Sequence, residues 1–171
     1  NLLLRPCEFI YFCIMEYAIV DIETTGSYAA GNSITEIAII VHDGNNVIDK
    51  YHSLINPSIN IPFHIQALTG ITNDLVADAP TFSEIAPEIF KYLHKRIFVA
   101  HNVNFDYSFI VHELKNAGIE WKATKLCTVR LSRKIIPNHP SYSLGKLYQG
   151  LGIPMYDRHR ALGDAEATVK L

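Results

Sequence analysis

The sequence predicts an α/β fold in which helices cover both faces of one sheet. Two apolar runs, residues 17–20 and 97–100, are rich in β-branched and aromatic residues and have the length of buried strands. Segments with the helical spacing of apolar residues lie between and after them, and strands that are apolar throughout need cover on both faces. The 171 residues, 49% of them hydrophobic, suffice for one domain with a substantial core.

The first part of the chain predicts three strands in an antiparallel meander. Strands are expected over residues 17–23, 34–41 and 47–55, and the polar run of residues 42–46 (His-Asp-Gly-Asn-Asn) is typical of a hairpin. Pro57, the first of two prolines after the third strand, ends the meander because proline has no N–H for the ladder.

Two helices are predicted between the meander and the strand 97–100. A short helix is expected over residues 62–68, stopped by Gly70, and a longer one over residues 81–95. Pro87 inside the longer helix removes one backbone hydrogen bond, so we expect a kink or a split helix there.

The remaining third alternates between helix and a short strand. A helix is expected to run from Phe105 to Gly118, followed by a strand over residues 126–129. Further helices are expected up to Pro137, from Ser143 to Gly152, and from about Arg160 onward. The expected units are an N-terminal extension over residues 1–14, outside the functional domain, and a domain over residues 15–171 that could be truncated at its C-terminus.

Composition narrows the classes of function. The formal net charge of −2 predicts no broad basic surface, which argues against a protein that simply grips duplex DNA. The three cysteines have neither metal-ligand spacing nor the even count of a disulfide framework, so a cytoplasmic location is the default. The apolar start of the chain is interrupted by Arg5, Pro6 and Glu8 and is too short to span a membrane.

Carboxylates follow the ends of the two central strands. Asp21 and Glu23 point to the same face of their strand, where two like charges repel unless a cation lies between them. Oxygen ligands suit hard ions such as Mg²⁺ or Mn²⁺. Asp106 lies in the first turn of a helix that follows the strand 97–100. The alternative for Asp21 and Glu23 is that they cap the following turn or lie solvated at the end of the strand, and the alternative for Asp106 is capping of its helix, where Asp is common.

The last helix adds another carboxylate and a histidine. Residues five apart on a helix point about 140° apart, so His159 and Asp164 cannot share a helical face. We therefore expect His159 in the loop before the helix, reaching back toward Asp164. A single histidine is more often a surface or core residue, and only its neighbours suggest a role as ligand or base.

Three segments together resemble a known family. Residues 21–26 (Asp-Ile-Glu-Thr-Thr-Gly), His101-Asn-x-x-Phe-Asp106 and His159-x-Ala-x-x-Asp164 resemble the three motifs of the DnaQ-like (DEDDh) 3′–5′ exonucleases. The resemblance covers about residues 16–171 and is greatest to the proofreading epsilon subunit of bacterial DNA polymerase III and the exonuclease domain of the Gram-positive replicative polymerase. It implies a ribonuclease H-like fold with a five-stranded mixed sheet and helices on both faces.

The resemblance also implies roles for the residues of these motifs. Asp21 would bridge two divalent ions, Mg²⁺ or Mn²⁺. Glu23 and Asp164 would complete the site of the ion that holds the attacking water, and Asp106 would support the second ion. His159 would be the general base.

Five further residues are implied to contact the substrate. Thr24 and Thr25 would line the terminal nucleotide, Leu68 and Phe105 would pack against the last bases, and Asn102 would complete the contact. Such contacts favour a single-stranded or frayed 3′ end. The alternative for Leu68 and Phe105 is ordinary core packing, which is favoured nearly as much for Phe105.

The expected function is a metal-dependent 3′–5′ exonuclease that hydrolyses DNA and releases nucleoside monophosphates in proofreading or repair. The alternatives are an RNA-directed exonuclease of the same family, because one contact decides whether a 2′-hydroxyl is accepted, and an inactive nucleic-acid-binding module. Thr69 stands where the epsilon subunit has histidine, which leaves the nucleotide contacts open. The expected partners are DNA 3′ ends and a polymerase, a repair protein or a fused domain, with no membrane.

Overall fold

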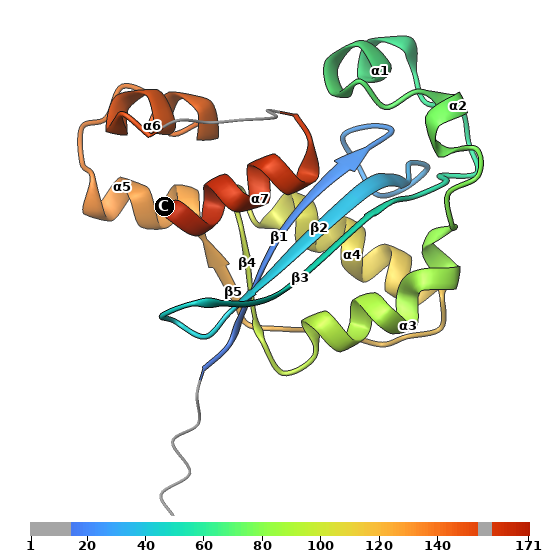
Figure 1. Ribbon diagram of the computed structural model, residues 1–171, viewed down its shortest axis with the longest axis horizontal. Helices are drawn as coiled ribbons and strands as arrows, with labels where there is room; N and C mark the ends of the chain where they lie inside the picture. The colour runs from blue at the N-terminus through green and yellow to red at the C-terminus, as the bar shows by residue number, and fades with distance from the viewer. Residues whose placement is uncertain (1–14, 154–158) are drawn as a thin grey trace, which may run out of the picture.

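A five-stranded mixed sheet forms the centre of the computed structural model, which describes residues 15–153 and 159–171 (Figure 1). Its order is β3-β2-β1-β4-β5, with β1, β2 and β3 antiparallel and β4 and β5 parallel to β1. The strands are β1 (Tyr17–Thr24), β2 (Ile34–His42), β3 (Val47–Leu54), β4 (Ile97–Ala100) and β5 (Lys125–Cys127). The predicted sheet and its meander are therefore confirmed. The expected N-terminal extension lies outside the described residues.

Seven helices are described around this sheet. They are α1 (Phe63–Thr69), α2 (Asn73–Val76), α3 (Phe82–Leu93), α4 (Asn104–Asn116), α5 (Thr128–Ile135), α6 (Leu144–Leu151) and α7 (Ala161–Lys170). Helix α2 is an element that the sequence analysis did not predict. Among the described residues, no helix combines the length and the apolar character that crossing a membrane requires.

A split of α3 at Pro87 and a strand over residues 126–129 are not what the structure has. Pro87 does not split α3, which continues from Phe82 to Leu93. Proline in this position removes only the N–H of its own residue, and the buried Ala86 and Ile89 on either side hold the helix against the sheet. Val129 is helical rather than extended, because β5 ends at Cys127 and α5 begins at the next residue.

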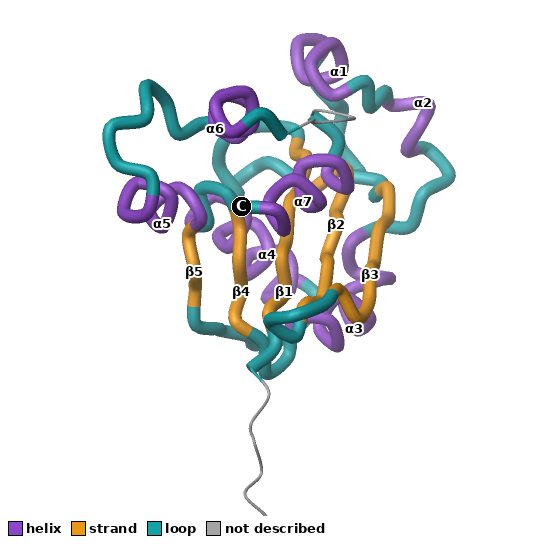
Figure 2. Tube along the Cα trace, turned by 60° about the vertical axis from the view of Figure 1, so that its left-hand side comes forward, coloured by secondary structure: helices purple, strands orange, loops and turns teal. Residues whose placement is uncertain are grey.

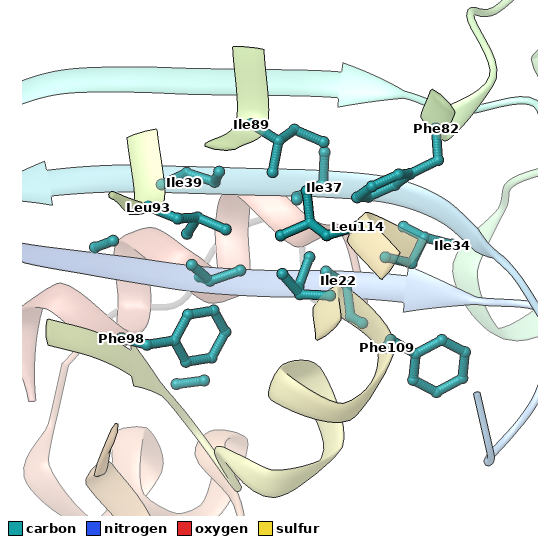
Figure 3. Packing of buried hydrophobic residues seen from close by; sticks show 14 of the residues in the cluster. Ile22, Ile34, Ile37, Ile39, Phe82, Ile89, Leu93, Phe98, Phe109 and Leu114 are labelled. Atoms are coloured by element: carbon teal, nitrogen blue, oxygen red, sulfur yellow. The ribbon is translucent and has the colours of Figure 1, made fainter. Parts of the chain in front are cut away.

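The two faces of the sheet bury different helices. Ala18, Val20 and Ile22 of β1 alternate toward α3 and α4 and join the larger core, part of which is drawn in Figure 3. Ile19 points the other way, together with Ala38 and Ile40 of β2, and packs against α7. Figure 2 shows α7 in front of the sheet with α3 and α4 behind it. Helix α7 thus covers the face on which the odd-numbered residues of β1 lie.

Candidate active site

Asp21 and Glu23 of β1 lie on the face of the sheet that α7 covers. They continue the alternation of Ile19, and the pairing with β2 sets Asp21 opposite Ala38 and Glu23 opposite Glu36. The strand is apolar up to Val20, and the two partly buried carboxylates then alternate with the buried Ile22 and Thr24. The predicted common face is confirmed.

Helix α7 brings a third carboxylate to this pair. Asp164 lies in the first turn of α7, and one oxygen each from Asp21, Glu23 and Asp164 lie within 4.8 Å of one another. All three residues are partly buried. Helix α7 can come this close because its inner face consists of the small buried residues Ala161 and Ala165.

Asp106 approaches from the opposite face of the sheet. It is the third residue of α4 and is 3% exposed. Strand β4 pairs with β1 only as far as Ile19, so the N–H of Ile22 lies beyond the end of the ladder, where the Asp106 carboxylate accepts it. Asp106 therefore replaces a missing strand partner as well as contributing a fourth carboxylate.

Burial and neighbouring carboxylates raise the pKa of Asp21, Glu23 and Asp106. Burial, followed by repulsion from Asp106, Asp164 and Glu23, raises the pKa of Asp21 well above its usual range. Burial and the charge of Asp164 raise the pKa of Glu23 to about 7. Burial raises the pKa of Asp106 to about 8. Carboxylates that are this reluctant to ionise together indicate a place built for a cation.

The donor set fits divalent metal ions. Asp21, Glu23 and Asp164 offer carboxylate oxygens only, with no sulfur or imidazole within the same 4.8 Å group among the described residues. Such ligands suit Mg²⁺ or Mn²⁺ rather than zinc. We conclude that the cluster is a candidate site for a hard divalent cation.

Glu36 is a buried acid that the sequence analysis missed. Its carboxylate is fully buried and accepts hydrogen bonds from Nε and Nη2 of Arg160, from Nε2 of His52 at 2.8 Å and from the backbone N–H of Ala161 at 2.9 Å. Although burial alone would raise the pKa of Glu36, these hydrogen bonds lower it below its usual value. A charged residue inside the apolar run of β2 was the available signal. Glu36 anchors the start of α7 rather than facing solvent.

His159 and Asn102 share an uncommon backbone conformation. His159 lies two residues before α7 with φ of 62°, and Asn102 lies two residues before α4 with φ of 72°. Left-handed residues other than glycine cost free energy and often mark functional sites. The expected position of His159 in the loop before the last helix is confirmed, whereas its role as a base stays a prediction.

The predicted substrate residues fall into two groups. Leu68 on α1 is 55% exposed and Asn102 is exposed, so both are available to a ligand. Thr24 and Thr25 are buried, and their hydroxyls donate to the Gly26 carbonyl at 2.7 Å and to Asn32 Oδ1 at 3.1 Å. These two hydroxyls shape the loop after β1.

Phe105 and Thr69 make contacts within the fold. The Phe105 ring lies 5.2 Å from that of Phe109 and packs against the larger core. Thr69 is 5% exposed, and its hydroxyl donates to the Ile65 carbonyl and accepts the N–H of Ile71. The departure from histidine at position 69 therefore serves the end of α1.

A mixed sheet of this order, with acidic side chains gathered where β1 ends and α7 begins, defines a nuclease of the ribonuclease H-like fold. The model of the RNase T family, which is described as an exonuclease family, matches residues 18–171. The chain therefore belongs to this family. The resemblance to DnaQ-like exonucleases is thereby confirmed.

Two kinds of known protein illustrate this membership. The chain is 42% identical over 156 residues to the 3′-5′ exonuclease DinG of Staphylococcus haemolyticus and 40% identical to that of Staphylococcus aureus. The match covers 91% of this chain but only 17% of each relative. These relatives are named as DinG rather than as a polymerase subunit.

Among solved structures, exonuclease X in complex with 5′ overhanging duplex DNA superposes with a TM-score of 0.72 at 27% identity, over 90% of this chain and 88% of that one. E. coli exonuclease I in complex with a dT13 oligonucleotide superposes with a TM-score of 0.82 at 20% identity, over 91% and 40% of the two chains. The second likeness establishes the fold.

Proposed function

We propose that this chain is a metal-dependent 3′–5′ exonuclease unit that hydrolyses DNA and releases nucleoside monophosphates. The observation that carries the proposal is the convergence of Asp21, Glu23 and Asp164 within 4.8 Å on one face of the sheet, with the buried Asp106 beside them. The names of the DinG relatives and the DNA in the exonuclease X structure support a DNA substrate.

The residues divide the work of hydrolysis. Asp21, Glu23 and Asp164 would hold two divalent ions, Mg²⁺ or Mn²⁺, and Asp106 would hold the second ion from the opposite side. When bound, such ions supply an activated water and stabilise the charge that develops on the leaving 3′-oxygen. His159, two residues before the start of α7, would accept the proton of the attacking water.

The substrate end would be held by groups around the carboxylates. Leu68 presents an exposed apolar side chain to a base, and Asn102 presents an exposed amide. Thr24 and Thr25 lie beside Glu23, and because their hydroxyls and the Thr25 N–H already have partners, their proposed role is to shape the loop that lines the terminal nucleotide. A terminal base that is not paired fits such contacts, which favours single-stranded or frayed 3′ ends.

The setting of the reaction is also proposed. Because the DinG relatives are about six times as long as the matched region, we place this exonuclease unit beside further domains of a DNA repair protein in the cytoplasm, in preference to a separate polymerase partner.

A digestion assay tests the proposal. Single-stranded DNA and its RNA counterpart, each labelled at the 3′ end, are incubated with the protein and Mn²⁺ or with EDTA. We expect metal-dependent release of mononucleotides, faster from DNA, that falls at least 100-fold in Asp21→Ala. The control Asp78→Ala removes an exposed carboxylate on the loop after α2 and should leave the rate unchanged.

Each other outcome has its own meaning. Faster release from RNA would replace the proposed substrate. Absence of release from both strands, or equal rates for Asp21→Ala and Asp78→Ala, would overturn the proposed activity.

A further inference from the structure

Acidic and basic residues are segregated between two flanks of the molecule. Residues 51–90 contain four Asp or Glu and no Lys or Arg, whereas residues 121–153 contain six Lys or Arg and no Asp or Glu. The first segment includes α1, α2 and most of α3, with Asp74 and Asp78 at α2 and Glu84 and Glu88 on α3, and the second includes β5, α5 and α6. Figures 1 and 2 show α1 and α2 on one side of the end of β1, and α5 and α6 on the other. The net charge of −2 conceals this division.

The basic flank contains a cavity of about 490 Å³. It is bounded by β5, the start of α4 and the exposed side of α5, and Asn102 forms part of its wall. Its cationic lining residues are Lys125, Arg130, Arg133 and Lys134. Four positive side chains around one hollow make a strong local field for an anion.

These cations are not neutralised by neighbouring acids. Among the described residues, none of the four forms an ion pair with a carboxylate. Lys125 Nζ lies 3.0 Å from Asn104 Oδ1, and the guanidinium of Arg133 lies 5.5 Å from the ring centre of Tyr142, so both contact uncharged groups. Their positive charge remains available to a ligand.

The backbone of the cavity is electropositive as well. Although burial alone would raise the pKa of the Cys127 thiol, backbone N–H groups directed at it, among them those of Arg130, Val103 and Asn102, lower that pKa. These N–H groups come from the starts of α5 and α4, where helices have unpaired donors. The cavity therefore combines cationic side chains with backbone N–H donors.

The basic flank is continuous with the carboxylate site. Cys127 pairs with Ala100, so β5 and β4 end at the same level. His101, the residue after β4, contacts α5 and the loop before α6, since its Nδ1 lies 2.9 Å from the Thr128 hydroxyl and its Nε2 lies 2.9 Å from the Tyr142 carbonyl. Two residues after Asn102, α4 begins and brings Asp106 to the site.

We propose that the flank formed by residues 121–153 binds the phosphodiester backbone of the strand whose 3′ end lies at Asp21, Glu23 and Asp164. The strand would leave the active site over β5 and α5. This inference rests on the proposed exonuclease function and adds a direction to it.

The opposite flank is unsuited to phosphates. On the side of α1 and α2, Asp74 and Asp78 repel a polyanion, and that side instead exposes apolar side chains, with Phe63 85% and Leu68 55% exposed. Such groups suit the bases at the strand end. The side of α1 and α2 therefore suits the bases of a DNA strand, and the flank formed by residues 121–153 suits its phosphodiester backbone.

Binding without catalysis tests the proposal. We would measure the anisotropy of fluorescein-labelled dT20 and dT3 in EDTA, as a function of salt, for the wild type and the triple variant Arg130→Gln/Arg133→Gln/Lys134→Gln. The control Lys91→Gln/Lys95→Gln/Lys115→Gln loses the same charge from the ends of α3 and α4. Hydrolysis of dT3 with Mn²⁺ checks the fold of each variant.

We expect the α5 variant to bind dT20 at least tenfold more weakly, with the log–log salt slope reduced by about 2, because each contact to single-stranded phosphate contributes about 0.7. Binding and hydrolysis of dT3 should remain within twofold of wild type. Equal dT20 affinities for the α5 variant and the control would overturn the proposal. Loss of dT3 hydrolysis in all proteins, the wild type included, would instead overturn the exonuclease function and leave the binding comparison valid.

Discussion

Two nitrogens of the Arg160 guanidinium, Nε and Nη2, donate hydrogen bonds to the carboxylate of Glu36. Nε lies 3.1 Å and 3.0 Å from the two carboxylate oxygens, and Nη2 lies 2.6 Å from Oε1. The same carboxylate accepts the N–H of Ala161, the first residue of α7. Since Asp164 lies one turn further along, β2 sets the position of a candidate metal ligand through this pair.

Glu36→Gln should damage stability and activity together. The substitution removes the negative charge of a fully buried acceptor that Arg160, His52 and the Ala161 N–H share, and because the Arg160 side chain is 38% exposed we expect a cost of about 3 kcal/mol, the lower end for a buried pair. We expect a lower melting temperature and at least a tenfold loss of exonuclease rate. The control Glu166→Gln breaks the exposed pair with Lys50, whose nitrogen lies 2.7 Å away, and such pairs contribute about 1 kcal/mol or less. Equal effects of the two variants would show that Glu36 does not position α7.

The metal-free protein should lose stability as the pH rises. The folded state raises the pKa of Glu23 from 4.5 to about 7 and that of Asp106 from 3.8 to about 8, so it holds protons that the unfolded chain has released. The resulting stability is present below the unfolded values and is lost as the pH passes through 7 and 8. Thermal melts in EDTA should give a lower melting temperature at pH 8.5 than at pH 5.5.

Two controls accompany these melts. Mn²⁺ should raise the melting temperature most at pH 8.5, where the carboxylates are ionised and bind it. Asp106→Asn keeps an acceptor for the Ile22 N–H but removes the charge, and should flatten the profile in EDTA. A melting temperature that rises from pH 5.5 to pH 8.5 in EDTA would contradict the electrostatic account.

Gly26→Ala should strain the loop that follows β1. A Cβ at this position would lie 2.3 Å from Asn32 Oδ1, the atom that accepts the Thr25 hydroxyl. Because Asn32 is also held by the Tyr28 carbonyl at 2.9 Å, it cannot move without losing contacts, and we expect a loss of about 1–3 kcal/mol in the free energy of unfolding. Urea unfolding measures this loss. The double variant Gly26→Ala/Asn32→Ala should lose less than the sum of the single variants, and strict additivity would contradict the proposed clash.

Leu68→Ala and Phe105→Ala should separate binding from packing. Leu68 is largely exposed, so its loss should raise KM for single-stranded DNA about threefold or more while the melting temperature stays within experimental error. Phe105 packs on Phe109, so its truncation should cost about 2–4 kcal/mol of stability. Steady-state kinetics and thermal melts of both variants check this, and an unchanged KM for Leu68→Ala would remove Leu68 from the substrate site.

Local pattern was enough to predict the parts of the site that follow strand geometry. The two-residue period places Asp21 beside Glu23, and the helix that follows β4 places Asp106 at the end of the sheet. The loop position of His159 followed from the helical angle to Asp164. Each of these depends on a few neighbouring residues.

Features that depend on distant residues were not predicted. Glu36 meets Arg160 across more than a hundred residues, and the order of its strand within the sheet decides that contact. The total charge hid the separation of residues 51–90 from residues 121–153, because opposite flanks cancel in a sum. The hydroxyls of Thr24 and Thr25 were expected to face a nucleotide, and only the folded loop reveals their partners in Gly26 and Asn32.

The docking of α7 on β1 and β2 has a consequence for synthesis. Asp21 and Glu23 leave the ribosome before Asp164, which emerges only with α7. A nascent chain that ends before Ala161 can pair its strands, yet the face formed by Ile19, Ala38 and Ile40 is still uncovered. Translation therefore completes the carboxylate cluster and closes that side of the core in the same step.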